Sequence, residues 1–135
     1  MDRLIIFNWN GINSNNQLSP YSERVLNILS QKYKLAIISK KNSRIAEIRI
    51  LQTELKTPYF DILFASADKT ADQYSRCMNK FSINPENTII VGNGSIEDID
   101  IGKSLGCNTY WIPNNGFEDH GHQRINSIEN LLTKI

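Results

Sequence analysis

Short apolar runs of strand length alternate with helix-forming segments along the whole chain. The runs are almost continuously apolar, which is typical of strands that are covered on both faces of a parallel sheet. Parallel strands need crossover connections, and these are usually helices that follow a right-handed path. The alternation therefore predicts an α/β fold, a three-layer α/β/α sandwich around a five-stranded parallel sheet. The expected strands are Leu4–Phe7, Leu35–Ser39, Ile62–Ala65, Thr88–Val91 and Thr109–Ile112.

The segments between the apolar runs carry apolar residues at helical spacing. Ser19-Pro20 opens the first of them, and proline is well placed in a first helical turn. Gly106 follows the fourth and is a good C-terminal stop. We expect helices from Pro20 onward and over Ile45–Leu55, Ala71–Phe81, Ile96–Leu105 and Ile125–Leu132.

Length and charge exclude several classes of protein. The chain has 135 residues, and its 15 basic and 14 acidic residues leave a net charge of +1. This length suits one domain over residues 1–135, and the balanced charge gives no support to a role on nucleic acid or on a membrane surface. Leu4–Phe7 is too short for a signal peptide or for a membrane span of about 20 residues. We expect a cytoplasmic protein.

The cysteines and histidines do not form a recognisable metal-binding pattern. Cys77 and Cys107 form no Cys-x-x-Cys pair, and buried thiols in a reducing compartment are the simplest interpretation. His120 and His122 lie in a polar loop where all supporting ligands are local, which favours solvated side chains over a metal site.

Polar residues stand at the carboxyl ends of three expected strands. Asn8 and Asn10 follow the first, Ser39 ends the second and Asn93 follows the fourth. Ligands of open α/β sheets bind at this edge, so we expect these residues to form one site. An amide has nearly the shape of a carboxylate, but it cannot attack phosphorus, act as a general acid or neutralise a divalent cation.

The expected strands Leu4–Phe7 and Thr88–Val91, with the residues that follow them, resemble motifs of the haloacid dehalogenase (HAD) superfamily. Leu4–Gly11 is similar to that family's hydrophobic strand followed by Asp-x-Asp-Gly, with asparagine at both aspartate positions. Val91-Gly92-Asn93 is similar to its Val-Gly-Asp motif, again with asparagine. Asp98 follows five residues later, as in the family pattern.

Two further segments resemble the HAD motifs that lie between these. Ile37-Ile38-Ser39 is similar to the second motif, a strand that ends in a hydroxyl residue. Asp68-Lys69-Thr70 is similar to the segment that carries the third-motif lysine. The resemblance runs in order from about Leu4 to Pro113 and implies a HAD-like, Rossmannoid fold. Only a short loop separates Gly11 from Pro20, which leaves no room there for a cap domain.

The resemblance also implies a role for each residue. The catalytic positions, nucleophile and proton shuttle, fall on Asn8 and Asn10, with Lys69 supplying positive charge. The phosphate-binding positions fall on Ser39, Lys69 and Gly11. The Mg²⁺ positions fall on Asn8, Asn10, Asn93 and Asp98, where three amides leave at most a vestigial site.

The sequence therefore predicts a HAD-like pseudoenzyme with a binding or assembly role and without a cofactor. Its ligand would be a phosphate-type anion held by Ser39, Lys69 and backbone amides, or a partner protein, or a second copy of the chain that covers the open site. The alternative is a phosphomonoesterase or related hydrolase with weak or unusual Mg²⁺-dependent activity that uses Asp98. A receiver-like signalling domain fits less well, because it also needs an acidic pocket.

Each of these residues also has a purely structural interpretation. The asparagines are common at strand ends and turns, and Ser39 could cap a helix. Lys69 could be a solvated loop lysine. Asp98 lies in an acidic first helical turn, which the helix dipole favours regardless of function.

Overall fold

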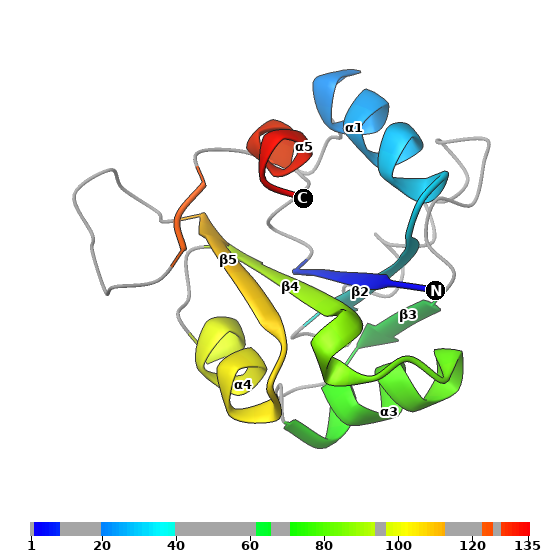
Figure 1. The fold of residues 1–135 in the computed structure, drawn as a ribbon, viewed down its shortest axis with the longest axis vertical. Helices are drawn as coiled ribbons and strands as arrows, with labels where there is room; N and C mark the ends of the chain where they lie inside the picture. Colours follow the sequence, from blue (N-terminus) through cyan, green and yellow to red (C-terminus); the bar gives the residue numbers. More distant parts are fainter. Residues whose placement is uncertain are drawn as a thin grey trace.

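Five parallel strands form a single sheet in the computed structural model of the chain, which describes residues 2–8, 20–39, 62–65, 71–93, 97–112, 123–125 and 128–135. The strand order is β3-β2-β1-β4-β5, so the first strand in the sequence is the central one (Figure 1). The predicted parallel sheet is confirmed, and four of the strands extend one or two residues beyond their apolar runs. The strands are β1 (Leu4–Asn8), β2 (Lys34–Ser39), β3 (Ile62–Ala65), β4 (Thr88–Asn93) and β5 (Asn108–Ile112).

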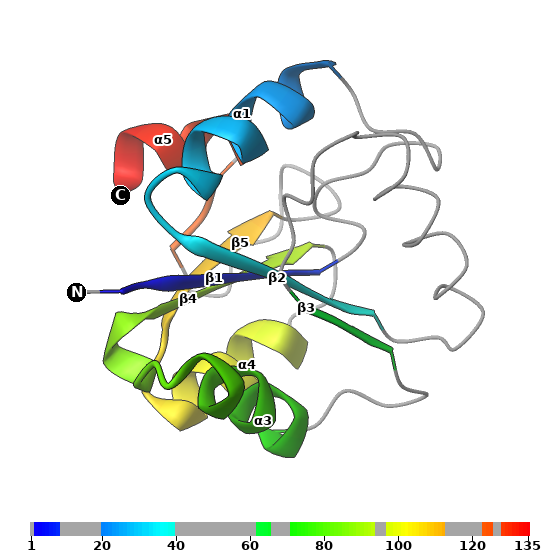
Figure 2. The same ribbon diagram turned by 90° about the vertical axis from the view of Figure 1, so that its right-hand side faces the viewer.

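Helices cover both faces of this sheet, which confirms the three-layer architecture (Figure 2). On one face lie α1 (Pro20–Ser30) and the C-terminal elements η3 (Ile128–Asn130) and α5 (Leu131–Lys134). On the other face lie α3 (Ala71–Phe81) and α4 (Glu97–Leu105). A short 3-10 turn, η2 (Pro85–Asn87), leads directly into β4. The helix expected over Ile45–Leu55 lies outside the described residues.

Alternate residues of β1 serve opposite faces of the sheet. Ile5 and Phe7 belong to the core beneath α1 and α5, whereas Leu4 and Ile6 belong to the core above α3 and α4. All four side chains are buried, with at most 1% of their surface exposed. A strand buried on both faces has no place for a polar side chain, which explains its uninterrupted apolar run.

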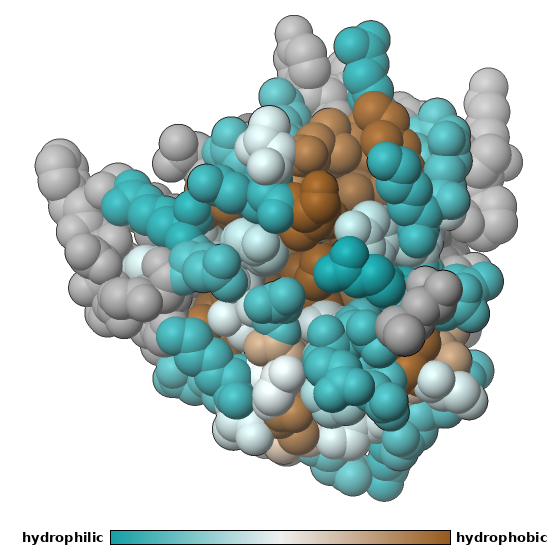
Figure 3. All heavy atoms as spheres, viewed as in Figure 1, coloured by the Kyte–Doolittle hydropathy of each residue, from teal (hydrophilic) through white to brown (hydrophobic). Residues whose placement is uncertain are grey.

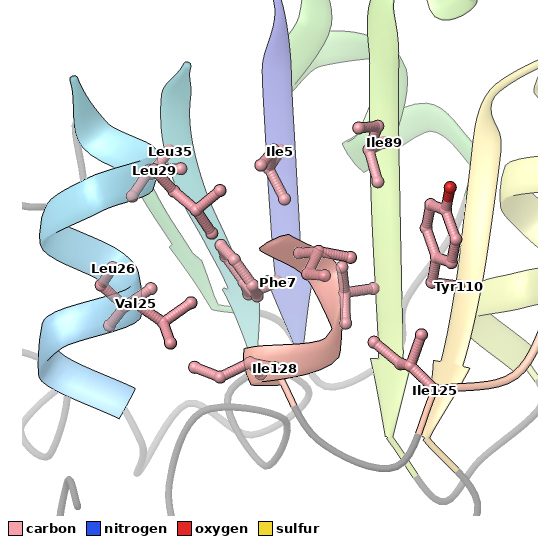
Figure 4. Packing of buried hydrophobic residues seen from close by; sticks show 12 residues of the cluster. Ile5, Phe7, Val25, Leu26, Leu29, Leu35, Ile89, Tyr110, Ile125 and Ile128 are labelled. Carbon is pink, nitrogen blue, oxygen red and sulfur yellow. The ribbon is translucent and has the colours of Figure 1, made fainter. Parts of the chain in front are cut away.

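The core on the α1 side is built from distant parts of the chain. Figure 4 shows Val25, Leu26 and Leu29 of α1 directed toward Phe7, with Ile128 on the adjoining C-terminal segment. The side chains of this core are all buried, with at most 7% of their surface exposed. Two apolar side chains outside it, Ile28 of α1 and Leu132 of α5, are 38% and 36% exposed, and apolar atoms reach the surface over these helices in Figure 3.

Close packing on the other face depends on a glycine in α4. A Cβ atom at Gly102 would lie 2.7 Å from Thr109 Cγ2 and 3.0 Å from Ile90 Cδ1. The first of these distances is shorter than real Cβ contacts allow. Glycine therefore lets α4 approach β4 and β5 closely.

The helix predicted over Ile125–Leu132 is wrong in its first part. Ile125 lies outside any helix, next to Arg124, which forms an isolated parallel bridge with Trp111 of β5, and the Ile125 N–H donates to the Trp111 carbonyl at 2.9 Å. The first helical turn described in this region is η3, which starts at Ile128. The apolar spacing nevertheless indicates burial correctly, because Ile125, Ile128 and Leu131 are each at most 3% exposed. Within the described part of the chain, no helix is long and apolar enough to cross a membrane.

Helices α3 and α4 end in the same hydrogen-bonding pattern, a Schellman motif. After α3, Ser82 N–H donates to Asn79 O and Ile83 N–H to Met78 O, both at 3.0 Å. After α4, Gly106 N–H donates to Lys103 O at 3.1 Å and Cys107 N–H to Gly102 O at 2.9 Å. The residue at the turn has a positive φ in both, 57° for Ser82 and 87° for Gly106. Only glycine adopts that conformation without a steric cost.

This pair of turns allows a reciprocal test of backbone strain. We expect Ser82→Gly to raise the free energy of unfolding by about 0.5 kcal/mol, because relief of the left-handed strain exceeds the added freedom of the unfolded chain. We expect Gly106→Ser to lower it by about 1 kcal/mol for the opposite reason. Urea unfolding followed by circular dichroism measures both. A Gly106→Ser protein as stable as the wild type would contradict this account.

Candidate functional site

The carboxyl ends of β2, β1 and β4 lie side by side, because β1 is the central strand. Asn8 ends β1 and pairs in register with Ile38, so Ser39 lies one residue beyond it on β2. On the opposite flank Phe7 pairs with Val91, so Asn93 lies two residues beyond that level on β4. Neighbouring strands are about 4.8 Å apart. The register thus brings the backbones of Asn8, Ser39 and Asn93 to one edge of the sheet.

Gly92 lies beside Asn8 in the sheet, which its sequence motif alone does not reveal. Since Phe7 pairs with Val91, continuation of the register carries Gly92 to the level of Asn8. Gly92 is buried at this level of the sheet. The pairing of Gly92 with Trp111 shows that it still belongs to the regular sheet.

No charged residue ends any of the five described strands. Two ends are amides, one is a hydroxyl and the remaining two are apolar: Asn8, Asn93, Ser39, Ala65 and Ile112. The rim of the sheet can therefore donate and accept hydrogen bonds, but its strand ends supply no negative charge. Asp98 lies in the first turn of α4. The other predicted site residues, Asn10, Gly11 and Lys69, lie outside the described part of the chain.

The two cysteines are removed from this edge. Both are free and buried in the core next to α3 and α4, as expected from the sequence, and Cys107 Sγ lies 3.7 Å from Met78 Sδ. Burial raises the pKa of the Cys77 thiol to about 12, although the charge of Lys80 opposes this. Burial also raises the pKa of Cys107 to about 11. Both thiols are protonated at neutral pH and are poor nucleophiles or metal ligands.

The described residues contain no group of three or more His, Cys, Asp and Glu side chains placed to hold a metal ion. The predicted loop with His120 and His122 lies outside them.

Comparison with known proteins identifies the family. A sequence profile described as haloacid dehalogenase-like hydrolase matches residues 4–112, which is most of the chain. The chain belongs to the haloacid dehalogenase-like hydrolase family. The expected family resemblance is thereby confirmed, and the match spans β1 through β5. No curated protein sequence matches the chain.

Solved structures support the same HAD-like fold. A HAD-superfamily hydrolase of subfamily IA from Geobacter sulfurreducens has a TM-score of 0.75 at 11% identity, with all of both chains covered. An uncharacterized protein from Listeria monocytogenes has a TM-score of 0.72 at 17% identity, and the match covers 98% of this chain and 99% of that one. At these identities the likeness shows the fold alone.

A third HAD neighbour is larger than this chain. It is a HAD-type protein from Bacillus subtilis that was solved bound to magnesium, with a TM-score of 0.73 at 22% identity. The match covers 88% of this chain but only 56% of that one. Other HAD neighbours share this proportion, including a HAD phosphatase from Thermococcus onnurineus, of which 58% is covered. The chain therefore spans little more than half the length of these two relatives.

The strand-end residues of this HAD chain are a poor donor set for Mg²⁺. This ion binds through carboxylate or phosphate oxygens and gives up its water reluctantly. The corresponding edge here offers two neutral amides and a hydroxyl at the ends of β1, β4 and β2. Neutral oxygens do not balance the charge of a dehydrated divalent cation, so these three described strand-end residues would not by themselves hold the ion.

Proposed function

We propose that this HAD-family protein is a pseudoenzyme that acts by binding and does not hydrolyse phosphate esters. Its site is the edge formed by the carboxyl ends of β2, β1 and β4. The proposed ligand is a phosphate-type anion, free or carried on a partner, held without Mg²⁺. The proposed contacts are hydrogen bonds from amides and from the Ser39 hydroxyl, together with the positive charge of Lys69.

The position of Asn8 is the observation that carries this proposal. Its strand is central in the sheet, and the strands that end in Ser39 and Asn93 flank it. The central strand of the sheet thus ends in an amide, at the position to which the family resemblance assigns the nucleophile. An amide cannot form the covalent phosphoryl intermediate that a carboxylate forms. Loss of a nucleophile alone commonly lowers the rate by several orders of magnitude.

Charge at the site favours an anion over a cation. Three amides in place of three carboxylates make the edge about three charges less negative at neutral pH. Three carboxylates would repel a phosphoryl group unless a metal ion neutralised them, whereas three neutral amides do not repel it. The donor hydrogens of amides and hydroxyls then face an acceptor-rich ligand.

Turnover and binding can be tested separately with the same protein. We expect no hydrolysis of p-nitrophenyl phosphate above the no-enzyme rate, with or without Mg²⁺. In EDTA, roughly 10 mM phosphate should raise the melting temperature by about 5 °C if the dissociation constant is about 1 mM. Ser39→Ala and Lys69→Ala should abolish that shift, whereas Lys80→Ala, an exposed lysine on α3, should keep it.

Each measurement can refute its own part of the proposal. Mg²⁺-dependent turnover in the wild type that disappears in Lys69→Ala would show a working phosphatase. An unchanged melting temperature at these phosphate concentrations would refute anion binding while leaving the absence of catalysis intact.

A further inference from the structure

Strand β5 is the outermost of the five strands and has the composition of an aggregation-prone edge. Its residues are Asn-Thr-Tyr-Trp-Ile, without charge, proline or glycine. β-Branched and aromatic residues of this kind favour extended pairing. The free backbone groups of such an edge can pair with the same strand of another molecule. This strand therefore requires some form of cover.

A short segment far along the chain pairs with that edge. Residues 123–125, here called the edge strap, run parallel to β5 and form a bridge between Arg124 and Trp111 (orange segment beside β5 in Figure 1). Trp111 N–H donates to Gln123 O at 2.8 Å, and Ile125 N–H donates to Trp111 O at 2.9 Å. Both outward backbone groups of Trp111 are therefore occupied.

A side chain extends this pairing beyond the strap's own backbone. The Gln123 Nε2 group donates to the Thr109 carbonyl at 2.9 Å. Thr109 lies two residues before Trp111, so its carbonyl is the next acceptor on the same edge of β5. The glutamine amide thus takes the place of a backbone N–H from a longer strand.

The strap is anchored by the hydrophobic core. Ile125 is only 2% exposed and packs in the same cluster as Tyr110 of β5 and Ile128 of η3. Arg124, which lies between Gln123 and Ile125 in the strap, is exposed. Three hydrogen bonds and one buried side chain therefore hold a three-residue segment against the edge.

We propose that the edge strap, residues 123–125, closes the β5 edge and prevents it from pairing with β5 of a second copy of this chain. The covered acceptors and donors on Thr109 and Trp111 are those that a second strand would need. Copies of the chain with the edge strap in place would then assemble through a surface other than the β5 edge.

Removal of the strap's contacts should produce self-association. Gln123→Met keeps the side-chain length but loses the donor to Thr109, and Ile125→Pro loses the donor to Trp111 while keeping an apolar side chain. We expect both variants to associate at concentrations about five- to tenfold lower than the wild type, as measured by light scattering after gel filtration. Hydrogen exchange at the Trp111 amide should be faster by a similar factor.

Two control variants separate edge opening from general destabilisation. Arg124→Lys keeps the positive charge of the exposed strap residue and should behave like the wild type. Thr88→Val removes a comparable hydrogen bond, from Thr88 Oγ1 to Asn84 O at 3.0 Å, on a strand inside the sheet. If Thr88→Val associates as readily as Gln123→Met, or if Gln123→Met remains as monodisperse as the wild type, the proposal is overturned. Should Ile125→Pro fail to fold, Gln123→Met decides.

Discussion

Aspartate restored together at positions 8, 10 and 93 should give this protein Mg²⁺-dependent phosphatase turnover at least about a thousandfold above the wild type. The expected gain is large because the three changes return the nucleophile, the proton shuttle and a metal-binding charge at once. Hydrolysis of p-nitrophenyl phosphate in Mg²⁺ and in EDTA measures the gain. The restored protein should also melt at a higher temperature in Mg²⁺ than in EDTA, because the ion binds only the folded state.

Two comparisons make this result specific. Lys69→Ala in the restored background should remove the new turnover, because the positive charge that faces the phosphoryl group is lost. Asn8→Asp alone should give far less than the triple variant, since the groups act as a unit. If the wild type already turns over as fast as an active triple variant, the proposed function fails. If the triple variant stays silent, the asparagines are not the sole reason for inactivity.

Leu131→Ala should lower the free energy of unfolding by about 3 kcal/mol, while the adjacent Leu132→Ala should lower it by less than about 1 kcal/mol. Leu131 is completely buried in the cluster that contains Phe7 and Leu26, whereas 36% of Leu132 is exposed. The first substitution leaves a cavity and the second removes a partly solvated side chain. The two variants differ only in which of two neighbouring leucines is shortened.

Urea unfolding of both leucine variants tests the role of the C-terminal segment. The family match ends at residue 112, yet three buried core side chains of the described residues come from beyond it. Equal stability of the two variants would show that this segment is dispensable for the core. A difference of the expected size would show that the HAD-like core of this chain is completed by its own tail.

The strands were predictable because each is a local pattern. An apolar run such as Leu4–Phe7 reports burial on both faces without any knowledge of its neighbours. Helix ends were predictable in the same way where a glycine marked them, as at Gly106. The left-handed Ser82 was not, because serine gives no such signal and the turn is stabilised by bonds back to Met78 and Asn79.

The wrong helix prediction at Ile125 also has its cause in a hydrogen bond that the local sequence does not reveal. Its apolar spacing with Ile128 and Leu131 is helical, and all three side chains are buried. Ile125 nevertheless lies outside the helical turns, and its N–H bonds to a carbonyl on β5. A periodic pattern predicts which side chains are buried, but it cannot reveal a hydrogen-bond partner elsewhere in the chain.

The chemical character of the candidate site was predictable from its residues. Their relative positions depend on the fold. Asparagine at positions 8, 10 and 93 is visible in the sequence, as are Ser39, Lys69 and Asp98. The strand–helix alternation and the uncharged chemistry of the motif positions can be read directly from the chain, because both depend on local composition. The folded chain was needed to learn that β1 is central, that Asn8 lies between the strands of Ser39 and Asn93, and that Gln123 bonds to the β5 edge. Those features depend on hydrogen bonds between segments far apart in the chain, and strand order and register exist only once such segments have met.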